Sequence, residues 1–153
     1  MSNKEEETYE DGDDILGDKI EYKDDNNLRI SFQNVNSFLA DDGDDRLTKA
    51  RQVYDFMSEH KIDVHAMVEI NVNWKCVPKS LTMQELARGW FENKKTSTAF
   101  NLHDRICKQS QPGGTAIVSQ GELALRWMKA EVDPSNMGRW NSQLFWGKQN
   151  LKL

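Results

Sequence analysis

The sequence lacks any long apolar run. No stretch of its 153 residues approaches the roughly 20 consecutive apolar residues that a membrane-spanning helix needs. The first residues also lack the short apolar region of a secretory signal peptide. We therefore expect a protein that does not associate with membranes and that works inside the cell.

Cysteine is scarce as well. Cys76 and Cys107 are the only two, and they lie far apart without forming a CxxC pair. A disulfide framework or a zinc site would need more cysteines at closer spacing. We expect both to be free thiols in a reducing compartment.

Two familiar ligand-binding motifs are missing too. The acidic runs at 11–14 and 41–45 lack the spacing of a calcium loop, with its glycine at the sixth position and glutamate at the twelfth. Gly113 and Gly114 are not followed by the Gly-Lys-Ser/Thr ending of a phosphate-binding P-loop. The glycine pair is better explained as a turn into a strand.

Charge of one sign dominates only at the N-terminus. The net charge is −5, but residues 1–26 hold 11 acidic and 3 basic side chains, whereas residues 27–153 hold 14 acidic and 17 basic ones. A segment with so many acidic and so few apolar side chains cannot bury enough apolar surface to offset the entropy that it would lose on folding. We expect a disordered acidic tail over 1–26, followed by a weakly basic domain that permits a polyanionic substrate.

The pattern after the tail predicts an α/β fold. Residues 28–34 alternate between apolar and polar, 45–60 carry a helical apolar face, and 63–69 form a second strand, which together make a βαβ unit. A capping box at 82–85 predicts a second helix, and strands are expected at 96–101, 115–118, 125–132, 139–146 and 151–153. This order indicates a mixed sheet with helices on its outer face. The sequence stops three residues into the last expected strand, so we expect residues 27–153 to be a partial domain truncated at its C-terminus.

Polar residues end the first two strands. Asn34 closes one and Glu69 closes the other, and ligands of open α/β sheets gather at the carboxyl ends of strands. Each residue alone has an ordinary explanation, because a strand-end asparagine commonly forms a turn and a glutamate commonly forms an ion pair. Their pairing on neighbouring strands predicts half of an active site.

The same stretches resemble the endonuclease/exonuclease/phosphatase superfamily. Residues 28–36 look like its opening strand, which ends in Asn, and 63–69 look like its second strand, which ends in a metal-binding Glu. The segments 69–74, 111–116 and 133–140 are closest to the endonuclease domains of LINE-type retrotransposons. The resemblance implies the N-terminal part of a two-sheet α/β sandwich that cuts nucleic acid, most directly DNA, with Mg²⁺.

Carried over residue by residue, the resemblance implies two site assignments and one weaker one. Glu69 would ligate the catalytic Mg²⁺, and Asn34 would contact the scissile phosphate or a neighbouring catalytic group. Asn36 stands where many relatives have an aspartate, and an amide is a poorer ligand for the cation.

The family's later residues are absent from this sequence. These are a Tyr, an Asp-x-Asn pair and a terminal Asp-His pair, so the resemblance predicts a chain that is inactive alone. Two alternatives stay open: a non-catalytic module that binds nucleic acid or a protein partner at an open sheet edge, and a phosphatase of the same superfamily. A nucleic-acid substrate would suggest the nucleus, although no run of Lys and Arg supports that location.

Overall fold

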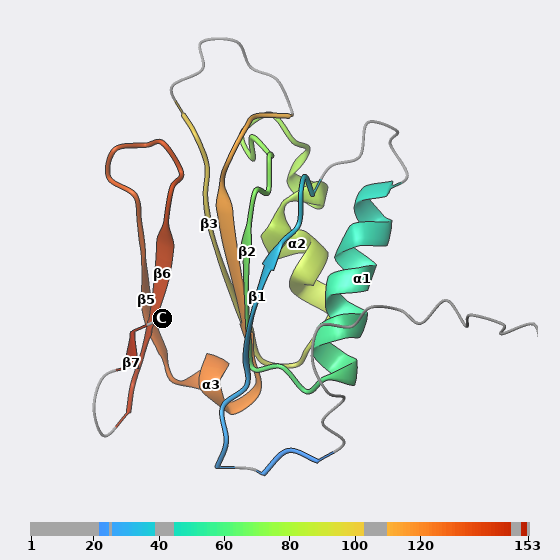
Figure 1. Ribbon diagram of the computed structural model, residues 1–153, viewed down its shortest axis with the longest axis vertical. Coiled ribbons are helices and arrows are strands. Elements are labelled where there is room, and N and C mark those ends of the chain that lie inside the picture. Colours follow the sequence, from blue (N-terminus) through green and yellow to red (C-terminus); the bar gives the residue numbers. More distant parts are fainter. Residues whose placement is uncertain (1–21, 25, 39–44, 103–109, 148–150, 153) are drawn as a thin grey trace, which may run out of the picture.

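Two stacked β-sheets with helices on one outer face make up the fold. The computed structural model describes residues 22–24, 26–38, 45–102, 110–147 and 151–152. Helices α1 and α2 lie on one face of the first sheet, and the second sheet lies on its other face (Figure 1). The α/β class, the βαβ start, the mixed sheet and the outer helices are all confirmed.

The first sheet has the strand order β1-β2-β4-β3. Its strands are β1 (Ile30–Asn34), β2 (Val64–Val68), β3 (Lys94–Ala99) and β4 (Thr115–Gln120). β1 runs parallel to β2, and β4 runs antiparallel to both β2 and β3. The carboxyl ends of β1, β2 and β3 therefore meet at one end of the sheet.

Helix α1 (Asp45–Glu59) makes the crossover between β1 and β2. Its apolar spacing buries Ala50, Val53 and Met57 against the sheet. The helix ends in a Schellman motif, because the amide of Ile62 donates to the carbonyl of Met57 and the amide of Lys61 donates to that of Ser58. Lys61 takes the left-handed backbone conformation at this cap, with φ of 50°. The chain is thereby turned directly into β2.

Alternate residues of the central strands pack into two separate hydrophobic cores. On the helical face, Met67 of β2 and Val118 of β4 pack with the buried face of α1. On the opposite face, Val64 and Ile117 pack beneath Phe145 of the second sheet. The strand period of two is what sends neighbouring residues to different layers.

The second sheet has the order β5-β6-β7. Its strands are β5 (Trp127–Val132), β6 (Asn141–Phe145) and β7 (Leu151–Lys152). Strand β5 follows a short helix, α3 (Gly121–Leu125), that the sequence did not reveal. The strand expected over 125–132 therefore begins two residues later, at Trp127. The residues before it belong to α3, which buries Leu123 and Ala124.

The second helix is shorter than its sequence pattern suggested. It consists of α2 (Met83–Leu86), flanked by two 3₁₀ turns, η1 (Lys79–Leu81) and η2 (Ala87–Gly89). The predicted capping box is wrong, since the Thr82 hydroxyl donates to the carbonyl of Lys79 and makes no bond to the helix. Glu85 pairs with Arg88 instead of reaching back to the cap. The preceding 3₁₀ turn competes for the threonine hydroxyl.

One further expectation, about the cysteines, is corrected. Cys76 is disulfide-bonded, so a free thiol was the wrong prediction there; Cys107 lies outside the described residues. Sequence spacing carries no information on which distant thiols the fold brings together.

The remaining expectations concern the tail and membranes. The predicted acidic tail over 1–26 falls almost entirely outside the described residues. In the part of the chain that the structure describes, no helix has the length and apolar character to cross a bilayer.

Candidate functional site

Asn34 and Glu69 lie together at one end of the first sheet. Asn34 is the register partner of Val68 across the parallel pair, so Glu69 is the next residue on the neighbouring strand. The amide of Ser37 donates to the carbonyl of Glu69 over 2.8 Å, which keeps Asn36 beside it too. The structure therefore brings Asn34, Asn36 and Glu69 to a single rim of the sheet.

Backbone hydrogen bonds tie this rim into three adjoining segments. The first segment, residues 34–38, pairs with the second, residues 69–73, through Ser37 and through the amide of Phe38, which donates to Ile70 over 2.8 Å. The second joins the third, residues 111–114, because the amide of Asn71 donates to Gly113 over 2.7 Å. The Asn71 side chain accepts the Gly113 amide in return, also over 2.7 Å. We call these three segments the strand-end rim.

Unusual backbone conformations concentrate in the strand-end rim. Among the described residues, six other than glycine have positive φ, and four of the six belong to this rim: Asn36, Ser37, Glu69 and Asn71. The left-handed conformation is costly for residues with a Cβ atom and persists only where surrounding bonds enforce it. Such residues cluster at functional sites, which supports the choice of this rim.

The Asn34 side chain helps to hold the backbone of the rim in its conformation. Its Oδ1 atom accepts a hydrogen bond from the amide of Asn36 over 3.0 Å, which makes an Asx turn. The ordinary turn-forming role of a strand-end asparagine is therefore real here. The Nδ2 group of Asn34 has no partner among the described residues and is exposed, so it can donate to a phosphate oxygen.

Glu69 is a free carboxylate. It is exposed, and its carboxylate has no ionic or hydrogen-bonding partner in the described part of the chain, so the structural ion pair that its position allowed does not form there. The same residues contain no group of three or more His, Cys, Asp or Glu side chains that could hold a metal. Mg²⁺ is commonly held by one or two carboxylates and keeps several of its waters. Within the three segments of the strand-end rim, Glu69 is the residue that could offer such a cation a carboxylate.

Two residues at the rim escaped the sequence analysis. The Lys49 ammonium of α1 donates a short hydrogen bond to the carbonyl of Ser37, which places a positive charge beside the rim. Gln111 is 3% exposed, and neither polar atom of its side-chain amide has a hydrogen-bond partner among the described residues. No local sequence pattern signals the contact of Lys49 or the burial of Gln111, because each depends on segments that are distant in the sequence.

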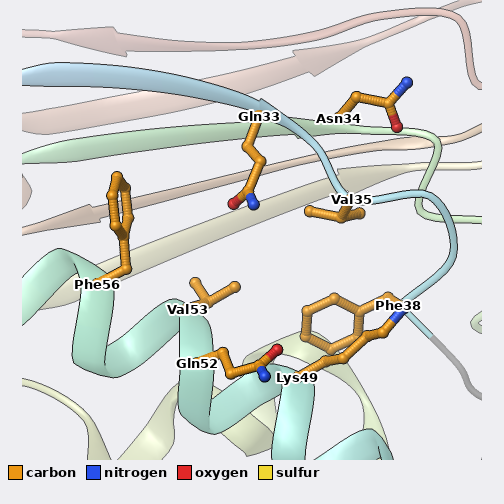
Figure 2. A pocket seen from close by; sticks show the side chains of 8 residues that line it. All are labelled: Gln33, Asn34, Val35, Phe38, Lys49, Gln52, Val53 and Phe56. Atoms are coloured by element: carbon orange, nitrogen blue, oxygen red, sulfur yellow. The ribbon is translucent and has the colours of Figure 1, made fainter. Parts of the chain in front are cut away.

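A cavity between β1 and α1 adjoins the strand-end rim and shares Asn34, Val35 and Phe38 with it. It has a volume of about 310 Å³ and is lined by residues of both elements: Gln33, Asn34, Val35, Phe38, Lys49, Gln52, Val53 and Phe56. Gln33 and Val35 point into this space, whereas the Asn34 side chain turns away from it (Figure 2). The cavity does not include Glu69.

No histidine of the described residues serves this rim. His65 is fully buried within β2, where its Nδ1 atom lies 2.7 Å from the Ser31 hydroxyl. Burial lowers the pKa of His65 to about 4, so its imidazole is neutral at pH 7. His60 follows α1 at the other end of the sheet, where its carbonyl accepts from Arg29. His103 lies outside the described residues.

Comparisons with known proteins give similarity to solved structures alone. No protein-family model matches the sequence, and no curated protein matches it either. Among solved structures, an AP endonuclease from Archaeoglobus fulgidus is similar at a TM-score of 0.47 and 19% sequence identity. The alignment covers 77% of this chain and 37% of that protein, so the chain spans well under half of its length.

Proposed function

We propose that the strand-end rim is the first half of a Mg²⁺-dependent phosphodiester site for nucleic acid. The observation that carries the proposal is the exposed carboxylate of Glu69, which has no partner among the described residues and belongs to a residue held at φ of 54° beside Asn34 and Asn36. The resemblance of both strand ends to the endonuclease/exonuclease/phosphatase superfamily supports the same reading.

Each residue has a chemical role in this proposal. Glu69 is the anionic ligand of the metal, and Asn36 is a weaker neutral one. The Nδ2 group of Asn34 donates to a phosphoryl oxygen, and the ammonium of Lys49 adds positive charge beside it. A bound Mg²⁺ would neutralise charge on the phosphoryl group and the leaving oxygen.

The proposal also holds that this chain binds but does not cleave. Hydrolysis needs a base to activate water, and neither His60 nor His65 lies at the rim. The described residues also hold no cluster of three or more His, Cys, Asp or Glu side chains. A site that lacks these groups cannot provide most of the interactions that stabilise the transition state. DNA is favoured over an inositol phosphate by the retrotransposon-like segments at 69–74, 111–116 and 133–140.

The first test is metal binding at Glu69. Mn²⁺ replaces Mg²⁺ as a paramagnetic probe, and we expect it to broaden the amide signals of Asn34, Asn36, Glu69 and Asn71 in an NMR spectrum. Glu69→Gln should abolish this broadening. Glu122→Gln, a matched change of an exposed glutamate in α3 at the other end of the sheet, should leave it intact. Equal broadening in both variants would refute the metal assignment.

The second test is activity. Plasmid DNA incubated with the chain and Mg²⁺ should remain unnicked, and a labelled DNA oligonucleotide should bind more tightly with Mg²⁺ than with EDTA. Nicking that persists through purification and disappears in Glu69→Gln would overturn the claim of inactivity. Mg²⁺-dependent binding of labelled inositol hexaphosphate that unlabelled DNA does not displace would favour the phosphatase alternative.

A further inference from the structure

The direction of the Glu69 carboxylate depends on the backbone that carries it. The side chain is exposed and has no partner in the described part of the chain, so no neighbouring group there orients it. The residue takes the left-handed conformation, with φ of 54°, which is costly for any residue with a Cβ atom. The contacts that enforce this conformation therefore decide where the carboxylate points.

Hydrogen bonds from the first segment of the strand-end rim fix one side of this backbone. The amide of Ser37 donates to the carbonyl of Glu69, and the amide of Phe38 donates to that of Ile70, each over 2.8 Å. The Ile70 side chain is 1% exposed and belongs to the core on the helical face. These contacts hold the carbonyls of residues 69 and 70, whereas the amides of residues 70 and 71 bond to the third segment.

Asn71 makes three hydrogen bonds to this third segment, residues 111–114. Its amide donates to the carbonyl of Gly113 and its Oδ1 atom accepts from the amide of Gly113, each over 2.7 Å. Its carbonyl accepts from the amide of Gln111 over 3.0 Å. The amide of Ile70 adds a longer bond to Gly114, over 3.3 Å. Three of these four bonds use Asn71, and one of the three uses its side chain.

The third segment needs a side-chain contact because its glycines are conformationally permissive. Gly113 and Gly114 have φ of 86° and 90°, and glycine adopts many other backbone conformations as readily. The two bonds between Asn71 and Gly113 close a ring, which restricts Gly113 more than one bond would. Asn71 itself has φ of 54°, a conformation that asparagine tolerates better than most residues.

We propose that Asn71 is a positioning residue for Glu69. Its side chain fixes the third segment, and that segment holds the amides of residues 70 and 71 so that Glu69 stays in the left-handed conformation. Groups that orient a metal ligand commonly contribute roughly 10- to 100-fold to metal affinity. The inference rests on the proposed function for the purpose of the Glu69 carboxylate, but the conformation of Glu69 is measurable without any metal.

The first measurement uses the full chain without metal. Asn71→Gly removes the side-chain bond and still permits the left-handed conformation at residue 71. We expect the amide of Gly113 to exchange faster with deuterium, and the NMR scalar couplings and carbon shifts of Glu69 to leave their left-handed values. Asn71→Asp keeps an oxygen that can accept from the Gly113 amide, so it should retain both native signals.

The second measurement is a Mn²⁺ titration of the native chain and the glycine variant. Asn71→Gly should raise the dissociation constant for Mn²⁺ at the rim by about tenfold. The matched control is Asn136→Gly, because Asn136 also has positive φ, at 59°, and lies outside the rim in the loop between β5 and β6. It should change neither the couplings of Glu69 nor the Mn²⁺ affinity, and thermal denaturation should show each variant folded.

The role of Asn71 is overturned if the couplings of Glu69 are unchanged in Asn71→Gly, or if that variant binds Mn²⁺ as tightly as the native chain. Equal effects of Asn71→Gly and Asn136→Gly would also overturn it. If the native chain binds no Mn²⁺, the proposed function fails by itself, and the metal-free couplings of Glu69 still decide whether Asn71 holds its backbone.

Discussion

His65 is the clearest case of a residue whose environment sets its chemistry. It is fully buried in β2, its Nδ1 atom lies 2.7 Å from the Ser31 hydroxyl, and its Nε2 atom has no hydrogen-bond partner. The Phe56 ring packs 5.4 Å from the imidazole. Adding a proton would leave a charge in this apolar setting without a counter-charge, which explains the lowered pKa.

We predict that His65 makes the fold acid-sensitive. Desolvation by burial lowers the pKa of His65 from 6.5 to about 4, so as pH falls the unfolded state takes up this proton first. The free energy of unfolding should therefore decline from pH 6.5 toward pH 4, by about 3 kcal/mol in all. Urea unfolding at pH 7 and pH 5 measures this decline.

His65→Gln is the control for the carboxylates that also titrate in acid. The glutamine keeps a polar group near Ser31 but takes up no proton. The stability of the variant should fall less than that of the native chain between pH 7 and pH 5. Identical losses in the two proteins would contradict the assignment to His65.

At the scale of elements, the loop between β5 and β6 is built around one carboxylate. Asp133 accepts hydrogen bonds from the hydroxyl and amide of Ser135 and from the amide of Arg139. The Ser135 hydroxyl is the main cause that lowers the pKa of Asp133 to about 2, with a smaller contribution from the Arg139 charge. Arg139 also forms an ion pair with this carboxylate, with its Nε atom 3.6 Å from an oxygen of Asp133.

The same loop docks on the end of β3 through Gly138. Its φ is 68°, and a Cβ atom there would lie 2.4 Å from two backbone atoms of Phe100. We predict that Gly138→Ala lowers the free energy of unfolding by about 3 kcal/mol or more, because backbone must move to admit the methyl group. Thermal or urea denaturation measures the loss.

Gly113→Ala separates this clash from conformational strain. Gly113 also has positive φ, at 86°, but nothing lies within 4 Å of its added Cβ atom. The variant should lose only about 1–2 kcal/mol, the cost of the left-handed conformation itself. A Gly138→Ala variant no less stable than Gly113→Ala would show that the loop can shift freely.

At the scale of the whole molecule, the two sheets are joined by an apolar contact and a polar one. Phe145 of β6 is fully buried against Val64 and Ile117 of the first sheet. Nearby, the Gln143 amide donates to the Ser97 hydroxyl and to the carbonyl of Ile117. Apolar burial contributes the stability, and the polar bonds select the register between the sheets.

We predict that Phe145→Ala destabilises the whole domain. Removing a fully buried phenylalanine costs about 3–5 kcal/mol, and its position between the sheets should weaken both together. Urea unfolding followed by tryptophan fluorescence and by circular dichroism measures the change. Trp146→Ala, at the next and 62% exposed position, should cost less than about 1 kcal/mol. A loss confined to one probe would instead indicate that the sheets unfold separately.

Much of the architecture was readable from local patterns. Alternation over 28–34 and 63–69 and the helical spacing over 45–60 predicted β1, β2 and α1, because burial on one face imposes those periods. The placement of Asn34 and Glu69 at one rim followed, since carboxyl ends of parallel strands meet. Short elements such as α3 and the 3₁₀ turns around α2 were missed, because a single turn has too few residues to show a period.

The sequence by itself determined the α/β class, the βαβ unit and the residues that end its strands. Only the tertiary structure decided the positive φ of Asn36 and Glu69 and the approach of Lys49 to Ser37. The physical reason is the distance along the sequence between the residues that interact. Period and capping depend on near neighbours, whereas backbone strain and buried charge depend on which distant segments the fold brings together.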